Sequence, residues 1–145
     1  MAAFDVQVVS ADRKLFSGKC TTLVAPGIDG YFGVLFGHAP MIAALGIGRL
    51  DLTPADGSVM HIAIAGGYAE VTPDRVEILA DTAEMAAEID IERARQAIRR
   101  AEGRMREKST DVNFDRAQAA LLRAENRLRV AEAGMYHTVR DDSKP

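Results

Sequence analysis

The sequence lacks the features that place a chain outside the cytosol or inside a membrane. It contains a single cysteine, Cys20, which cannot form a disulfide within the chain, so a reducing compartment is expected. It has no run of about 18 apolar residues that could form a membrane-spanning helix. The N-terminus has no basic stretch followed by an apolar one, as a secretory signal would have. These absences predict a soluble, cytosolic protein.

An excess of positive charge is also missing. Lys and Arg together number 18, Asp and Glu number 21, and the formal net charge is −3. Proteins dedicated to binding nucleic acids usually carry a basic excess, so the composition disfavours that class.

Common catalytic signatures are absent as well. The histidines His38, His61 and His137 have no metal-ligand spacing, and Cys20 has no adjacent base. Neither a GxSxG elbow nor a GxxxxGK[ST] phosphate loop occurs. The glycine-rich stretch 27–33 precedes no helical pattern and predicts a turn-rich loop. We therefore expect no enzymatic activity from the isolated chain and no metal site.

Residues 1–85 have the pattern of β-strands. The stretch 4–10, FDVQVVS, alternates apolar and polar residues with period two. Asp56-Gly57 and Pro73-Asp74 each separate two strand-like runs and predict hairpins. Because no helical segments lie between these strands, they favour an antiparallel sandwich or barrel, and we expect the sandwich.

Residues 88–135 have the pattern of two helices, the first capped by Asp90. Small or apolar residues recur every three or four positions, which is typical of helices that pack against each other. In the first helix they are Ile91, Ala94, Ile98, Ala101 and Met105; in the second they are Phe114, Ala117, Leu121, Ala124, Leu128, Ala131 and Met135. The polar stretch 107–113 interrupts the pattern, so an antiparallel helical hairpin is expected.

The predicted fold class is therefore α+β: an N-terminal antiparallel β-sandwich, a C-terminal antiparallel two-helix hairpin, and a flexible polar tail at 136–145. Alanine fills much of both helical seams, and each alanine buries little apolar area. We expect the hairpin to be marginally stable and easily opened.

Several arginines flank these seams. Arg93 and Arg100 are seven residues apart, as are Arg116 and Arg123, and Arg127 follows one turn later. Seven residues nearly complete two turns, so each pair shares one face of its helix. Two interpretations are open: a solvated face balanced by neighbouring glutamates, or a site for an anion such as phosphate or carboxylate.

The stretches FDVQVVSADRKLFSG, GVLFGHAPMIAAL, IAGGYAEVTPDRVEILAD and the helix ending in RLRVAE closely resemble the epsilon subunit of bacterial F-type ATP synthases. The likeness covers roughly residues 4–132. It implies a non-catalytic central-stalk subunit, peripheral on the cytoplasmic face of the bacterial membrane. Its sandwich would bind the gamma subunit and the c-ring. Its hairpin would extend into the alpha/beta catalytic ring and inhibit ATP hydrolysis.

Some members of that family bind ATP in the compact hairpin, with the signature I/L-D-x-x-R-A, which the stretch from Ile89 to Ala94 matches. The resemblance implies ATP as a regulatory ligand and leaves the need for Mg²⁺ open. The implied ATP-binding residues are Glu84, Ile89, Asp90, Arg93, Ala94, Arg100, Arg116, Arg123 and Arg127. Arg95, Arg99 and Arg104 are not required by the signature.

The resemblance also implies that Tyr31 and His38 contact the c-ring or gamma, although Phe36 stands where the family commonly has proline. Two alternatives remain. The subunit could lack ATP sensing, its arginines pairing instead with acidic surfaces of beta or gamma. More remotely, the arginine-rich hairpin could bind nucleic acid.

Overall fold

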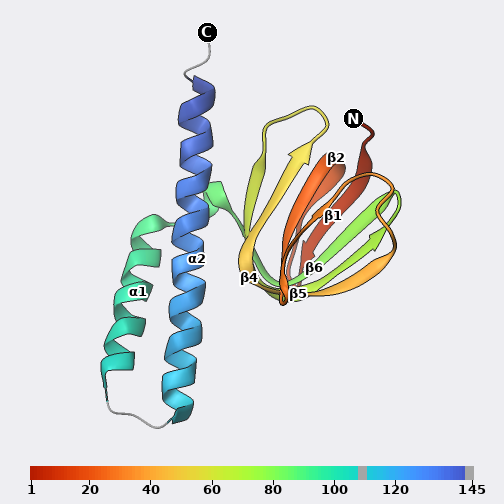
Figure 1. Ribbon diagram of the computed structural model, residues 1–145. Coiled ribbons are helices and arrows are strands. Elements are labelled where there is room, and N and C mark those ends of the chain that lie inside the picture. Colours follow the sequence, from red (N-terminus) through yellow and green to blue (C-terminus); the bar gives the residue numbers. More distant parts are fainter. Residues whose placement is uncertain (108–110, 143–145) are drawn as a thin grey trace. The chain divides into compact units, whose positions relative to one another are not determined.

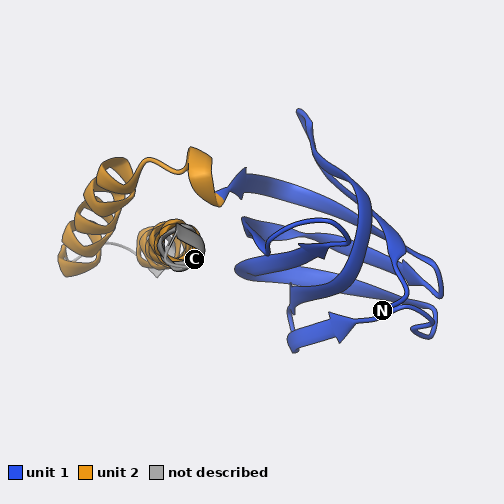
Figure 2. Cartoon of the chain, turned by 90° about the horizontal axis from the view of Figure 1, so that it is seen from above, with its two compact units in different colours: residues 1–85 blue, residues 86–145 orange. Residues whose placement is uncertain are grey.

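The structure, a computed structural model, describes residues 1–107 and 111–142, and describes side chains over 1–107 and 113–135. The chain divides into two compact units, residues 1–85 and residues 86–145 (Figure 2). No helix in the described part of the chain is both long enough and apolar enough to cross a lipid bilayer.

Six strands form the first unit (Figure 1). They are β1 (Phe4–Ser10), β2 (Lys14–Gly27), β3 (Gly30–Val34), β4 (Met41–Pro54), β5 (Met60–Thr72) and β6 (Arg75–Met85). Their order in the sheet is β1-β6-β5-β4-β2-β3, and β1 also pairs with β2, so the sheet closes on itself. The predicted fold class is confirmed, with one addition: β1 pairs with β6 in parallel, whereas the other pairs are antiparallel.

The closed sheet surrounds an apolar core. In β1, Phe4, Val6 and Val8 are buried while Asp5 is exposed, as the period-two pattern predicted. Cys20 lies in this core with 0% of its surface exposed, and burial raises the pKa of its thiol to about 11. The thiol is therefore protonated at neutral pH and behaves as a small apolar residue.

Both predicted hairpin turns are present in the sheet. Residues 55–59 join β4 to β5, and Thr72 pairs with Arg75 across the Pro73-Asp74 turn. The predicted loop at 27–33 is wrong in part, because Gly27 pairs with Gly30 and β3 begins there. Gly30 has φ 130°, a conformation that favours glycine, so a two-residue turn suffices and the next residues form a strand.

The second unit consists of the short 3₁₀ helix η1 (Ala86–Glu88), α1 (Ile91–Arg106) and α2 (Asp111–Asp142). The helices α1 and α2 lie side by side and run antiparallel (Figure 1). The seam between them is alanine-lined, as predicted. Its buried alanines are Ala94 and Ala101 in α1 and Ala117, Ala124 and Ala131 in α2.

The predicted seam of α2 is wrong at its two ends. Phe114 and Met135 are 41% and 57% exposed, although the spacing placed both in the seam. The reason is length: α1 has 16 residues and α2 has 32, so the ends of α2 extend past the helix that would cover them. The helix α2 continues through 136–142, within the region predicted to be a flexible tail, and the flexibility of that region stays a prediction. Residues 143–145 of that tail lie outside the described residues.

Candidate functional site: the arginine flank of the hairpin

The stretch Ile89–Ala94 begins the first long helix. Asp90 is the N-cap of α1, and its carboxylate accepts a hydrogen bond of 3.1 Å from the Arg93 backbone N–H. Ile89 is 7% exposed and donates its own N–H to the Ala86 carbonyl at 3.3 Å. Ala94 is fully buried in the seam. Three positions of the signature therefore have a structural role that needs no ligand.

The arginines fall on one side of the hairpin. At about 100° per residue, Arg93 and Arg100 lie roughly 100° around α1 from the seam alanines. Arg116 and Arg123 have the same offset, in the same rotational sense, on α2. Two antiparallel helices are related by a two-fold axis perpendicular to both, so equal offsets place side chains on the same side of the pair.

We call this side the arginine flank. Arg104 lies on this flank of α1 and Arg127 lies on this flank of α2. Each is displaced in the same sense by roughly 80° around its helix from the first seam alanine, Ala94 or Ala117. Its members are Arg93, Arg100, Arg104, Arg116, Arg123 and Arg127.

The opposite flank is neutralised within each helix. Glu92 pairs with Arg95 at 3.9 Å and with Arg99 at 3.5 Å. In α2, Glu125 pairs with Arg129 at 3.2 Å. Among the described side chains, by contrast, Arg93, Arg100, Arg104, Arg116 and Arg123 form no ion pair. The sequence allowed the arginines to form a solvated face balanced by glutamates. That description fits the flank that contains Glu92 and Glu125, and it does not fit the arginine flank.

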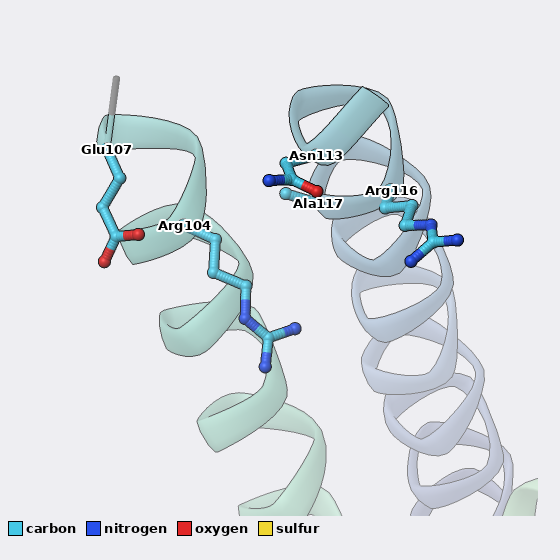
Figure 3. Close-up of a pocket in the computed structure, with 5 residues that line it drawn as sticks. All are labelled: Arg104, Glu107, Asn113, Arg116 and Ala117. Carbon is cyan, nitrogen blue, oxygen red and sulfur yellow. The ribbon is translucent and has the colours of Figure 1, made fainter. Parts of the chain in front are cut away.

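A groove of about 330 Å³ lies where the flank reaches the α1–α2 loop (Figure 3). We call it the loop-end groove, and its lining residues are Arg104, Glu107, Asn113, Arg116 and Ala117. One arginine of the flank from each helix therefore contributes to the lining of a single depression. In Figure 3 the Arg104 guanidinium points toward α2, whereas the Arg116 guanidinium points away from α1. In Figure 3 the Glu107 carboxylate lies apart from both guanidinium groups.

The flank is long compared with a single anion. Counted from the groove, Arg93 and Arg127 are each eleven residues away along their helices, which corresponds to about 16 Å. Arg100 and Arg123 lie between, at about 6 Å and 10 Å from the groove. The structure therefore places Arg93 level with Arg127, Arg100 near Arg123, and Arg104 level with Arg116.

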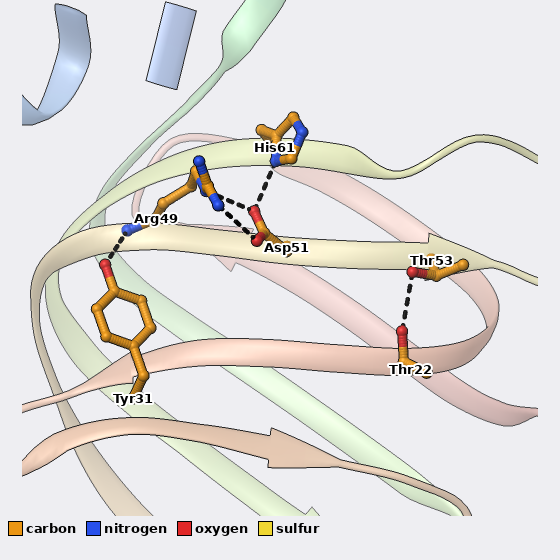
Figure 4. Close-up of polar contacts among 6 residues, drawn as sticks. All are labelled: Thr22, Tyr31, Arg49, Asp51, Thr53 and His61. Atoms are coloured by element: carbon orange, nitrogen blue, oxygen red, sulfur yellow. Dashed lines mark hydrogen bonds and ion pairs between the residues drawn. The ribbon is translucent and has the colours of Figure 1, made fainter. Parts of the chain in front are cut away.

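Glu84 belongs to the first unit. It lies near the end of β6, half-buried, and pairs in register with Ala63 of β5, which in turn pairs with Arg49 of β4. The next row on this outer face contains Asp51, whose carboxylate lies 2.6 Å from the His61 Nδ1 and 2.9 Å from the Arg49 Nε (Figure 4). The sequence pattern predicts His61 only as a strand residue with no metal-ligand spacing. Only the register reveals this cluster, because Asp51 and His61 belong to different strands.

Tyr31 lies near the start of β3, whereas His38 lies after its end. The Tyr31 hydroxyl accepts a hydrogen bond from the Arg49 backbone N–H at 3.0 Å (Figure 4). His38 follows β3, and its Nδ1 lies 2.7 Å from the Ala39 carbonyl oxygen. The adjacent Gly37 donates its N–H to the Pro73 carbonyl in the β5–β6 turn. The two predicted contact residues therefore have different hydrogen-bond partners in the segment around β3.

Each of the two units matches a known protein family. Residues 3–86 match the family described as "ATP synthase, Delta/Epsilon chain, beta-sandwich domain", and residues 87–132 match "ATP synthase, Delta/Epsilon chain, long alpha-helix domain". The ATP synthase epsilon chain of Moorella thermoacetica is 43% identical over 108 residues, which are 74% of this chain and 81% of that one. That of Dehalococcoides mccartyi is 44% identical over 74% of this chain and 76% of that one.

Solved structures show the same fold. A chain of the Euglena gracilis mitochondrial ATP synthase superposes with a TM-score of 0.79 at 23% identity, over 93% of this chain and 82% of that one. A chain from the Tetrahymena thermophila mitochondrial ATP synthase, described as central stalk and c-ring, gives a TM-score of 0.59 at 14% identity, over 90% of this chain and 95% of that one. The protein belongs to the ATP synthase delta/epsilon family, as an epsilon subunit of the bacterial F-type enzyme and a non-catalytic component of its central stalk.

Proposed function

We propose that the hairpin regulates the synthase by binding ATP along the arginine flank. In the compact state, ATP holds α1 and α2 together; without ATP, the hairpin opens, extends into the alpha/beta ring and inhibits ATP hydrolysis. The observation that carries this proposal is the asymmetry of charge. One flank has its arginines paired with Glu92 and Glu125, whereas Arg93, Arg100, Arg116 and Arg123 lack ion pairs among the described residues.

Unpaired guanidinium groups on adjacent helices repel each other, and a polyphosphate would relieve that repulsion. Arginine suits this task because its planar fork donates two parallel hydrogen bonds to phosphate oxygens. We assign the phosphates to Arg93, Arg100, Arg123 and Arg127. Glu84, Ile89 and Asp90 belong to the adenine end. The need for Mg²⁺ is not part of the proposal.

The alanine seam makes such a switch energetically reasonable. Each buried alanine contributes about 2 kcal/mol less than a buried leucine would, so the seam holds the helices weakly. A ligand that binds only the compact state stabilises it by RT ln(1 + [L]/Kd), about 2.7 kcal/mol at a hundredfold excess over Kd. For a weakly held hairpin, this is enough to move the equilibrium between closed and open forms.

Isothermal titration of the isolated full chain with ATP tests the proposal. Arg93→Gln and Arg123→Gln each remove one cation of the arginine flank, and each should weaken ATP binding by about tenfold or more, equivalent to ~1.4 kcal/mol. Arg95→Gln is the matched control, because it removes the same charge from α1 on the flank where Glu92 already pairs with it. It should change the affinity by less than about twofold.

An absence of binding heat at millimolar ATP would refute ATP sensing. The alternative would then stand: arginines that pair with acidic surfaces of beta or gamma in the extended state. Equal weakening by Arg95→Gln and Arg93→Gln would refute the specific flank, since it would show only a general dependence on charge.

The first unit is proposed to attach the subunit to gamma and to the c-ring, at the cytoplasmic face of the membrane. Exposed apolar side chains support a docking role: Ile28, Leu35 and Phe36 are 66%, 53% and 53% exposed in the segments that flank β3. Tyr68 and Leu79 pair directly in register on the outer face and are 60% and 52% exposed. Large apolar side chains gathered at a surface are typical of protein interfaces. Tyr31 and His38 lie in the same segments around β3.

A further inference from the structure

The short helix η1 contacts α2 at the end of the hairpin opposite the loop. A Cβ added at Gly134 of α2 would lie 2.8 Å from the Cβ of Ala86 in η1, which is closer than two such carbon atoms approach in proteins. The two backbones therefore lie closer together than a side chain at position 134 would allow. We call this approach of Ala86 to Gly134 the η1 contact.

The η1 contact accounts for a glycine that is otherwise unfavourable in α2. In a helix interior, glycine is less favourable than alanine because it loses more backbone freedom on folding. Gly103 in α1 has the same disadvantage, but a Cβ there would meet no atom within 4 Å, so a helical glycine alone does not indicate a contact. Val130, one turn before Gly134 and on nearly the same side of α2, is 0% exposed. This side of α2 is therefore packed up to the η1 contact.

The place of η1 in the chain makes the contact a restraint on the hairpin. The helix η1 precedes α1 by two residues, and the Ile89 N–H donates to the Ala86 carbonyl at 3.3 Å, so Ala86 is held close to the start of α1. The loop joins the helices at the other end of α1, about 24 Å away for 16 residues. A hairpin that is covalently joined at one end separates most at the other. The η1 contact must therefore break when α1 and α2 move apart.

Neither the arginine flank nor the ATP-binding signature includes this contact. The match to the helical domain of the family ends at residue 132, and Gly134 lies beyond it. We propose that the η1 contact is a conformational restraint built into this chain, which holds α2 near the start of α1 and limits opening of the hairpin whether or not ATP is bound. Its regulatory role rests on the proposed function, in which opening of the hairpin causes inhibition.

Four versions of the full chain test the contact in the absence of ATP: wild type, Gly134→Ala, Ala86→Gly and the double variant. In wild type, the clash with Ala86 offsets the gain in helix propensity from Gly134→Ala, so exchange of the Val130 backbone amide should be unchanged or faster. With Ala86→Gly, the clash is absent and only the gain remains. The same substitution should then slow that exchange about two- to fivefold. The effect of Gly134→Ala should thus depend on residue 86.

Gly103→Ala is the matched control, because it makes the same chemical change where a Cβ would meet no neighbour. Its effect on amide exchange in α1 should be the same with and without Ala86→Gly. Circular dichroism at 222 nm checks that every variant is folded. An equal effect of Gly134→Ala in the two backgrounds would overturn the η1 contact.

The hydrolysis rate of the assembled enzyme tests the restraint on opening. Gly134→Leu places a side chain where the η1 contact leaves no room, so the hairpin should open more readily and hydrolysis should fall about twofold or more. Gly103→Leu, which adds the same side chain to α1, should leave the rate close to wild type. Equal rates for these two variants would overturn the restraint.

A failure of the proposed function is distinguishable from a failure of the restraint. If the hairpin does not inhibit the enzyme, a chain that ends after Glu88 leaves the hydrolysis rate unchanged. The dependence of Gly134→Ala on residue 86 would still appear in amide exchange, since that experiment contains neither ATP nor the other subunits, and it would support the η1 contact.

Discussion

Asp90 shows how one residue of the proposed ATP-binding signature also stabilises the fold. Its carboxylate accepts the Arg93 N–H at 3.1 Å and caps α1, which leaves one carboxylate oxygen for other contacts. Loss of ATP binding after a change at Asp90 would therefore have two explanations: a lost contact or a frayed helix. For this reason the arginines are the better probes of the ATP proposal.

The capping role can be measured without ATP. Asp90→Ala should lower the free energy of unfolding of the hairpin by about 1 kcal/mol, because the Arg93 N–H loses its acceptor. Asp90→Asn should cost much less, since asparagine caps helices about as well as aspartate. Urea unfolding followed by circular dichroism at 222 nm gives both values. Equal losses in the two variants would show that the charge of Asp90, rather than its hydrogen bond, stabilises the helix.

At the scale of the helices, the stability of the hairpin depends on the helix propensity of each residue and on the room available for its side chain. Gly103 lies inside α1, and a Cβ added there would meet no atom within 4 Å. Gly134 lies inside α2, and a Cβ added there would come within 2.8 Å of the Ala86 Cβ. The two glycines carry the same intrinsic penalty in a helix, but only Gly134 is required by a close approach.

Gly103→Ala should therefore raise the free energy of unfolding of the hairpin by about 0.5–1 kcal/mol. Gly134→Ala is its control: the same gain in helix propensity should be offset by the clash with Ala86, so that stability is unchanged or lower. Urea unfolding at 222 nm measures both variants. Equal gains would contradict this view, because they would show that η1 moves away from α2 at no cost.

At the scale of the whole molecule, each unit has its own source of stability. The apolar core of the first unit is built from residues between Phe4 and Ala80, within a sheet that closes on itself. The second unit relies on an alanine seam. We infer that the first unit is the more stable of the two, and that regulation acts on the second.

A chain that ends after Glu88 tests this division of roles. It should fold with a cooperative thermal transition, assemble with the stalk through the first unit, and leave ATP hydrolysis uninhibited. Circular dichroism, co-purification with gamma and the hydrolysis rate of the assembled enzyme measure these three outcomes. If the shortened chain folds but fails to assemble, then docking requires the hairpin. If it assembles and hydrolysis stays inhibited, then inhibition does not come from the hairpin.

Much of the local structure follows from the sequence because it depends on neighbouring residues. The alternation in 4–10 identified the buried face of β1, and Pro73-Asp74 identified a turn. The spacing of Ala94, Ala101 and Ala117 identified the helical seam. In each case, the period of the backbone fixes which side chains share a face, whatever the rest of the chain does.

Features that join distant segments could not be predicted in this way. The parallel pairing of β1 with β6, the contact of Asp51 with His61, and the exposure of Phe114 and Met135 depend on register and on the relative lengths of neighbouring elements. The same holds for the loop-end groove. Arg104 and Arg116 each occupy an ordinary position on a helix surface, and only the antiparallel packing of α1 on α2 places the two in one depression.

The sequence by itself determined the strands, the two helices and the face on which each arginine lies, because these depend on backbone periods of two and 3.6 residues. The tertiary structure decided which arginines lie on the same side of the hairpin and which line one groove, because only packing sets distances between segments far apart in the chain.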